Sequence, residues 1–203
     1  MIEGDSKEYE VFEEAIKQLT NPIGATVEIG VRRGMGSKMI IDSFRKHRPN
    51  VKLNHLGIDP YGNIEYNPME AHLNVRLDYT NDMKRDALLD FTKDYPEFHL
   101  VCLEDTEFFT RYSDGYPIYD QYKIMLTKYD LVHFDGPHDV ASVLNEINFF
   151  HQKKAKECIF VFDDVRSYPH DKVDVYLKHI LQGYELIHNG ERKAVYFNKS
   201  KKL

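Results

Sequence analysis

The sequence has no apolar run that approaches the roughly 18 residues needed to cross a bilayer, so it predicts no membrane span. Its opening stretch, MIEGDSKEYE, is acidic and lacks the basic-then-apolar layout of a signal peptide. These absences favour a cytoplasmic protein with no membrane partner.

The sequence also has few cysteines, and its net charge is negative. The two cysteines, Cys102 and Cys158, lie in apolar runs, which predicts buried free thiols and not a disulfide. The formal net charge of −6 argues against a nucleic-acid-binding protein, which normally presents a basic face. We therefore expect a small-molecule substrate and no nucleic-acid partner.

The length of 203 residues, with 42% hydrophobic and 30% charged residues, suits one globular domain. Strand-like and helix-like patterns alternate, which predicts an α/β fold with a mostly parallel sheet and helices on both faces. A terminal hairpin predicts one antiparallel strand at the sheet edge. We divide the domain into an N-terminal helix (1–22), a core (23–165), and a C-terminal helix and hairpin (166–203).

Particular elements follow from periodicity and capping signals. Asp5 and Glu8 have capping-box spacing at the start of a predicted helix, and helical turns are predicted around 104–112 and again before 129. The long segment 60–81 has no clear periodicity, which is typical of a functional loop. The predicted strands are 26–30, 53–59, 98–103, 129–135, 158–164, 183–189 and 193–198, and the predicted helices are 5–20, 36–47, 82–93, 140–150 and 171–181.

Acidic residues follow successive predicted strands. The carboxyl ends of parallel strands share one edge of the sheet, where ligands bind in such folds. Carboxylates gathered there repel one another unless something binds among them. These acids are Glu28, Asp59, Glu104, Asp105, Asp135, Asp163 and Asp164.

The stretch VEIGVRRGMGS (27–37) joins the first such strand to a helix. Its glycines stand at 30, 34 and 36, which is not the G-x-G-x-x-G spacing of a dinucleotide site. Glu28 suits a cationic or hydroxyl-bearing ligand, and Asp59 is placed to accept hydrogen bonds from ribose hydroxyls. This combination fits S-adenosylmethionine better than NAD.

The segments VEIGVRRGMGS, LGIDPY, YDLVHFDGPHDVASVLNEI and CIFVFDDV resemble the class I S-adenosylmethionine-dependent methyltransferases. The likeness is greatest to the metal-dependent, macrocin-type sugar O-methyltransferase branch, and it covers about residues 25–165 and the terminal hairpin. It implies a Rossmann-like methyltransferase fold with a seven-stranded sheet. It also implies S-adenosylmethionine contacts at Glu28, Gly30, Gly34, Asp59, Asp105, Thr106 and Asp135.

In the metal-dependent branch, an aspartate and a following acidic pair hold a divalent cation. The resemblance therefore implies a Mg²⁺ site formed by Asp135, Asp163 and Asp164, with His138 as the general base. The pair here is Asp–Asp where the branch has Glu–Asp, which puts the shorter Asp163 in doubt. Independently of the family, carboxylates form a hard-oxygen site that suits Mg²⁺.

Other residues have weaker claims. His133 lies inside a predicted strand, and we expect it to point away from the neighbours of Asp135. A position of His170 at the border of the site is a less favoured interpretation. Arg32 and Arg33 fit an anionic substrate or a solvated loop equally well.

Three functional hypotheses stay open: a Mg²⁺-assisted O-methyltransferase acting on a small, sugar-like hydroxylated acceptor, a metal-independent methyltransferase, and a non-catalytic cofactor-binding module of the same fold. The intact DGPH and FDD motifs favour the first. The sequence is compatible with a homo-oligomer. It does not identify the methyl acceptor.

Overall fold

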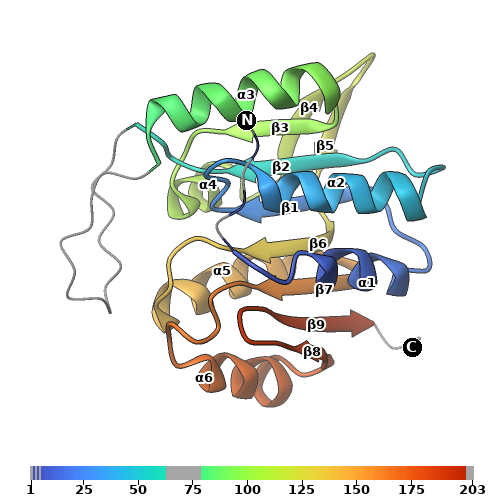
Figure 1. Ribbon diagram of the computed structural model, residues 1–203. Helices are drawn as coiled ribbons and strands as arrows, with labels where there is room; N and C mark the ends of the chain where they lie inside the picture. The colour runs from blue at the N-terminus through green and yellow to red at the C-terminus, as the bar shows by residue number, and fades with distance from the viewer. Residues whose placement is uncertain (1, 3, 5, 63–78, 200–203) are drawn as a thin grey trace.

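The computed structural model describes residues 2, 4, 6–62 and 79–199, and strands and helices alternate along the chain as predicted (Figure 1). The strands are β1 (Ala25–Ile29), β2 (Asn54–Ile58), β3 (Phe98–Val101), β4 (Tyr116–Tyr119), β5 (Lys123–Leu126), β6 (Tyr129–Phe134), β7 (Lys154–Phe162), β8 (Tyr184–Asn189) and β9 (Ala194–Lys199). The helices are α1 (Glu10–Gln18), α2 (Met35–His47), α3 (Asn81–Asp94), α4 (Asp105–Arg111), α5 (Val140–Gln152) and α6 (His170–Val175), which continues into the π-helical turn η1 (Tyr176–Leu181).

Seven strands form one sheet in the order β3-β2-β1-β6-β7-β9-β8. The chain builds outward from β1 through β2 to β3, then returns to place β6 on the other side of β1. Strand β9 runs antiparallel between β7 and β8. The predicted mixed sheet is confirmed, but the antiparallel strand is not at the edge, because β8 takes that place. The reversal of strand order at β1 is where ligands bind in folds of this kind.

Two apolar layers cover the faces of the sheet, as predicted. On one face, α1, α2 and α3 pack through Phe12, Phe44 and Phe91 in a single core cluster. On the other face, α4, α5, α6 and η1 pack against the sheet in a second cluster that contains Phe108 and Phe150. The central strands β1 and β6 are buried along their whole length, whereas β8 alternates because it is an edge strand.

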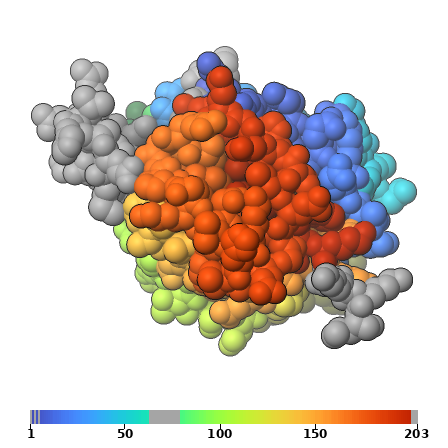
Figure 2. All heavy atoms as spheres, turned by 90° about the horizontal axis from the view of Figure 1, so that it is seen from below, coloured from blue at the N-terminus to red at the C-terminus, as the bar shows by residue number. Residues whose placement is uncertain are grey.

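The N-terminal segment does not form the predicted capping box. Helix α1 begins at Glu10 without a side-chain cap, and Asp5 lies outside the described residues. Glu8 instead accepts hydrogen bonds from the backbone N–H groups of Glu191, Arg192 and Lys193 at the β8–β9 turn. The two ends of the chain are thereby joined, and Figure 2 shows blue N-terminal atoms beside the red C-terminal hairpin.

Two further features of the described residues differ from the prediction. Residues 116–126 form the antiparallel β4–β5 hairpin where a helical turn was predicted, because their short apolar runs pair with each other. Cys158 is buried as predicted, but Cys102 is exposed. Within the part of the chain that the structure describes, no helix combines the length and apolar character needed to cross a bilayer. Most of the 60–81 segment, 63–78, lies outside the described residues.

Candidate active site

A pocket of about 330 Å³ opens at the carboxyl ends of β1 and β2. Asp59, Asp105 and Thr106 line it, as the sequence analysis expects for cofactor contacts, and so does Gly30. Tyr79 also lines the pocket, although no sequence pattern singled it out. The remaining lining residues are Ile29, Ile58, Pro60, Leu103, Glu104, Gly136 and Pro137.

Two glycines of the β1–α2 loop are required by its geometry. Gly30 has φ +83°, and a Cβ there would lie 2.0 Å from the carbonyl oxygen of Asp135. Gly34, also at φ +83°, precedes the first residue of α2, and a Cβ there would lie 2.3 Å from the Phe91 ring. Side chains are strained at such φ values and have no room here. Gly30 thus lets the loop backbone approach the end of β6, and Gly34 lets the start of α2 pack closely on Phe91 of α3.

Asp59 is fully buried at the end of β2. One carboxylate oxygen accepts hydrogen bonds from the backbone N–H groups of Val31 and Arg32, and the other accepts one from Tyr61. Burial raises the pKa of Asp59 to about 6, and the three N–H donors lower it again only in part. The residue therefore holds the glycine loop, and the oxygen that accepts only the Tyr61 hydrogen bond has the capacity to accept another.

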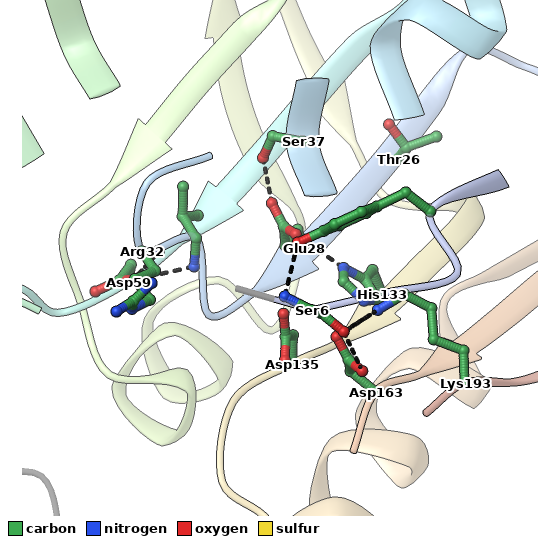
Figure 3. A network of polar contacts seen from close by, with 12 residues as sticks. Ser6, Thr26, Glu28, Arg32, Ser37, Asp59, His133, Asp135, Asp163 and Lys193 are labelled. Carbon is green, nitrogen blue, oxygen red and sulfur yellow. Dashed lines mark hydrogen bonds and ion pairs between the residues drawn. The ribbon is translucent and has the colours of Figure 1, made fainter. Parts of the chain in front are cut away.

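Glu28 belongs to a buried polar chain beneath the loop. Its carboxylate accepts a hydrogen bond from the Ser37 hydroxyl and contacts His133 Nδ1 at 2.8 Å (Figure 3). Ser37 is in turn 2.8 Å from His55 Nε2, and His55 Nδ1 is 2.8 Å from the hydroxyl of Thr26. Helix α2 and strands β1, β2 and β6 are thus linked through one continuous polar chain.

The expectation that His133 points away from this site is wrong. Glu28 of β1 is directly opposite His133 of β6, so both side chains lie on the same face of the sheet. Asp135 is two residues further along, and ligand atoms of Glu28, His133 and Asp135 all lie within 4.8 Å of one another. The two-residue spacing of His133 and Asp135 was the available signal, but the β1–β6 pairing was not readable from the sequence.

Asp135, His138 and Asp164 come together beyond β6 and β7. The Nε2 atom of His138 lies 3.9 Å from Asp135 Oδ1 and 3.8 Å from Asp164 Oδ2. The ring of His138 stacks on Tyr168 with an interplanar angle of 9°. Asp164 has φ +50° and forms an ion pair with Arg192. One imidazole thus lies between two half-buried carboxylates, an arrangement that can bind a cation or move a proton.

Asp163 has different surroundings from Asp164. It is 1% exposed, and its carboxylate pairs with the buried ammonium of Lys193. Its other oxygen accepts hydrogen bonds from the Ser6 hydroxyl and the Asp164 backbone N–H. Each oxygen of Asp163 is therefore already engaged by the protein, and Figure 3 shows Lys193 and Ser6 beside it. Lys193, which sequence reasoning missed, gave no signal because it follows a turn in which a lysine is ordinarily exposed.

His170 is not among the residues that line the pocket at the ends of β1 and β2. Its ring contacts the hydroxyls of Tyr168 at 3.0 Å and Tyr196 at 3.2 Å. It lines a separate hollow with residues of β8 and β9. Burial lowers its pKa to about 4, so His170 is neutral at physiological pH and serves as a hydrogen-bonding bridge.

Comparisons with known proteins agree with this architecture. Residues 27–165 match the family of methyltransferase domains. The O-methyltransferase NovP shares the fold with a TM-score of 0.65 and 16% identity, over 94% of this chain and 79% of NovP. CalS11, a TDP-rhamnose 3'-O-methyltransferase of calicheamicin biosynthesis, has a TM-score of 0.55 and 13% identity, over 93% of this chain and 76% of CalS11. An rRNA methylase from Streptococcus thermophilus has a TM-score of 0.56 and 7% identity, over 98% of this chain and 100% of the methylase.

No curated protein matches the sequence. The matched segment, 27–165, nevertheless covers more than half of the 203 residues and contains the glycine loop, Asp59 and the acids after β6. The sheet order and the position of the pocket agree with it. The chain therefore belongs to the methyltransferase-domain family and is a class I S-adenosylmethionine-dependent methyltransferase.

Proposed function

We propose that this enzyme transfers a methyl group from S-adenosylmethionine to a hydroxyl oxygen of a small, sugar-like acceptor, with Mg²⁺ at the acceptor. The observation that carries the proposal is the convergence of Asp135, His138 and Asp164 next to the pocket at the strand ends. A base between two carboxylates suits the deprotonation of a hydroxyl group, which a nitrogen acceptor does not always need.

The pocket supports a definite orientation of the cofactor. Asp59 accepts a hydrogen bond from a ribose hydroxyl, and the wall formed by Asp105 and Thr106 takes the adenine ring. The methionine end then lies toward Gly30 and Gly34 of the loop and toward Glu28 near the end of β1. This orientation places the sulfonium methyl toward Asp135 and His138, because Gly30 is in contact with the backbone of Asp135.

The metal proposal rests on the donor set. Asp135 and Asp164 supply hard carboxylate oxygens on either side of His138, and Mg²⁺ commonly takes one or two carboxylates with water or substrate oxygens. Asp163 would then not bind the ion, because its carboxylate forms the buried ion pair with Lys193 next to Asp164. Bound Mg²⁺ would increase the acidity of an acceptor hydroxyl. His138 accepts that proton, and the two carboxylates stabilise the imidazolium that results.

The acceptor class is proposed from the likeness to NovP and to the TDP-rhamnose methyltransferase CalS11. An rRNA methylase shares the same fold, so the fold does not exclude an RNA acceptor. The net charge of −6 favours the small molecule, because RNA binding would be opposed by charge repulsion.

Asp59→Ala should weaken the binding of S-adenosylhomocysteine (SAH) by roughly 10–100-fold, because a hydrogen bond to a carboxylate is lost. In the parent protein, affinity should also fall as the pH drops through about 6, where Asp59 becomes protonated. Titration calorimetry measures both effects. Asp114→Ala, in an exposed loop, is the control. Equal SAH affinity in Asp59→Ala and the control would mean that the cofactor site is misplaced.

Removal of divalent metal should abolish methyl transfer but leave SAH binding intact. The test adds excess EDTA, then excess Mg²⁺, while methyl transfer from S-adenosylmethionine to a panel of hydroxylated sugars is followed. Asp135→Asn and Asp164→Asn should each weaken Mg²⁺ binding in a calorimetric titration, because each removes one anionic ligand. Full activity in EDTA would instead identify a metal-independent methyltransferase.

A further inference from the structure

Helix α5 carries a carboxyl group that the proposed reaction does not use. Glu146 is 0% exposed, and neither of its oxygens has a hydrogen-bond partner of good geometry among the described residues. Burial of an unpaired carboxylate is costly, so a glutamate is retained in such a place only when it is neutral or has a task.

Glu146 lies behind two walls of the cofactor pocket. Gly136 forms one wall, and a Cβ on Gly136 would lie 3.3 Å from Glu146 Oε1 and 2.8 Å from Ile29. Asp105, at the start of α4, forms another wall and interacts with the Glu146 side chain. One buried carboxyl group therefore lies next to both the loop after β6 and the acid expected at the adenine ring.

The pair can share one proton, and the surroundings decide where it resides. Burial raises the pKa of Glu146 well above its ordinary value, and the charge of Asp105 raises it further. Burial also raises the pKa of Asp105, but the Thr106 backbone N–H and the Glu146 side chain lower it. The charge of Asp139 also disfavours a negative charge on Glu146. The nearby Tyr168 is a neutral phenol whose own pKa is raised by burial and by Glu146. The proton therefore belongs to Glu146 and the charge to Asp105.

We propose that Glu146 is a positioning residue for the cofactor ring: as a neutral acid it donates a hydrogen bond to Asp105 and directs the Asp105 carboxylate toward an exocyclic amino group. The pocket then prefers an adenine ring to a hypoxanthine ring, whose oxygen at that position cannot donate a hydrogen bond. This inference rests on the proposed S-adenosylmethionine site and adds the residue that sets its base preference.

The test compares the parent protein with Glu146→Leu and Glu146→Gln. SAH and S-inosylhomocysteine, which carries oxygen in place of the amino group, are titrated against each protein by calorimetry. Glu146→Leu should weaken SAH binding by roughly tenfold and reduce the preference over S-inosylhomocysteine, because Asp105 loses its donor. Glu146→Gln should retain both, since its amide still donates a hydrogen bond to Asp105. Asn148→Ala, on the exposed side of α5, should leave both unchanged.

The pH profile separates this role from simple packing. As the pH rises, SAH affinity of the parent should fall once Glu146 ionises, whereas Glu146→Gln cannot titrate at this position and should stay level over the same range. This comparison holds even if Glu146→Leu fails to fold. Identical pH profiles for parent and Glu146→Gln would overturn this inference and leave the proposed function standing. An unchanged ligand preference in a folded Glu146→Leu would do the same. A parent protein that binds no SAH would overturn the proposed function and this inference with it.

Discussion

His138→Ala is expected to lower the turnover of methyl transfer by about 10²–10⁴-fold, the usual contribution of a general base. The Nε2 atom lies 3.9 Å and 3.8 Å from the carboxylates of Asp135 and Asp164, and the Tyr168 ring fixes the orientation of the imidazole. SAH affinity should hardly change, because His138 does not line the pocket proposed to hold the cofactor. Stopped-time methyl-transfer assays and calorimetric titration of SAH measure the two effects on one protein preparation.

The matched control is His179→Ala, which removes an exposed imidazole from η1 and should leave turnover unaltered. If His138→Ala retained turnover within about threefold of the parent, no general base would be acting at this position. His138 would then be an ordinary residue before α5, and the proton would have to leave by another route. An equal loss of turnover and of SAH affinity would point instead to a collapsed loop after β6.

Much of the site could be predicted from the sequence because its acids follow continuous apolar runs. Glu28 lies within such a run and Asp59 ends the next, and parallel strands bring their carboxyl ends to one edge. The same reasoning predicted that Asp135 and Asp164 lie close together, and in the structure their carboxylates lie 3.9 Å and 3.8 Å from His138 Nε2. Strand positions were predictable because buried parallel strands read as uninterrupted Val, Ile, Leu and Phe.

The remaining features depend on contacts between distant segments. The pairing of Glu28 with His133 requires β1 and β6 to be neighbours, which local patterns do not determine. The β4–β5 hairpin forms from short runs that no turn signal separates clearly from a helix. Glu8 likewise binds backbone groups more than 180 residues away, so its capping-box spacing was misleading.

The buried ion pair of Lys193 and Asp163 gives a second large expected effect, on stability. Lys193 is 0% exposed, and its ammonium also lies 5.0 Å from the centroid of the Tyr9 ring. Lys193→Met should lower the free energy of unfolding by about 3–5 kcal/mol, because it leaves the Asp163 carboxylate buried without its cation. Lys193→Met combined with Asp163→Leu should recover most of that loss, since no unpaired charge is left behind. Urea unfolding at neutral pH compares the parent, the single variant and the double variant.

The pH dependence follows from the same pair. Burial alone would raise the pKa of Asp163, but Lys193 and the surrounding hydrogen bonds overcome it and hold the pKa below its ordinary value of 3.8. A lowered carboxyl pKa contributes stability that is present above about pH 3.8 and is lost as the pH falls through the folded-state pKa. The parent should therefore lose more stability in acid than the double variant does. If Lys193→Met unfolded within about 1 kcal/mol of the parent, the pair would not be anchoring this side of the site. Asp163 would then be available to bind the metal, as the family resemblance first implied.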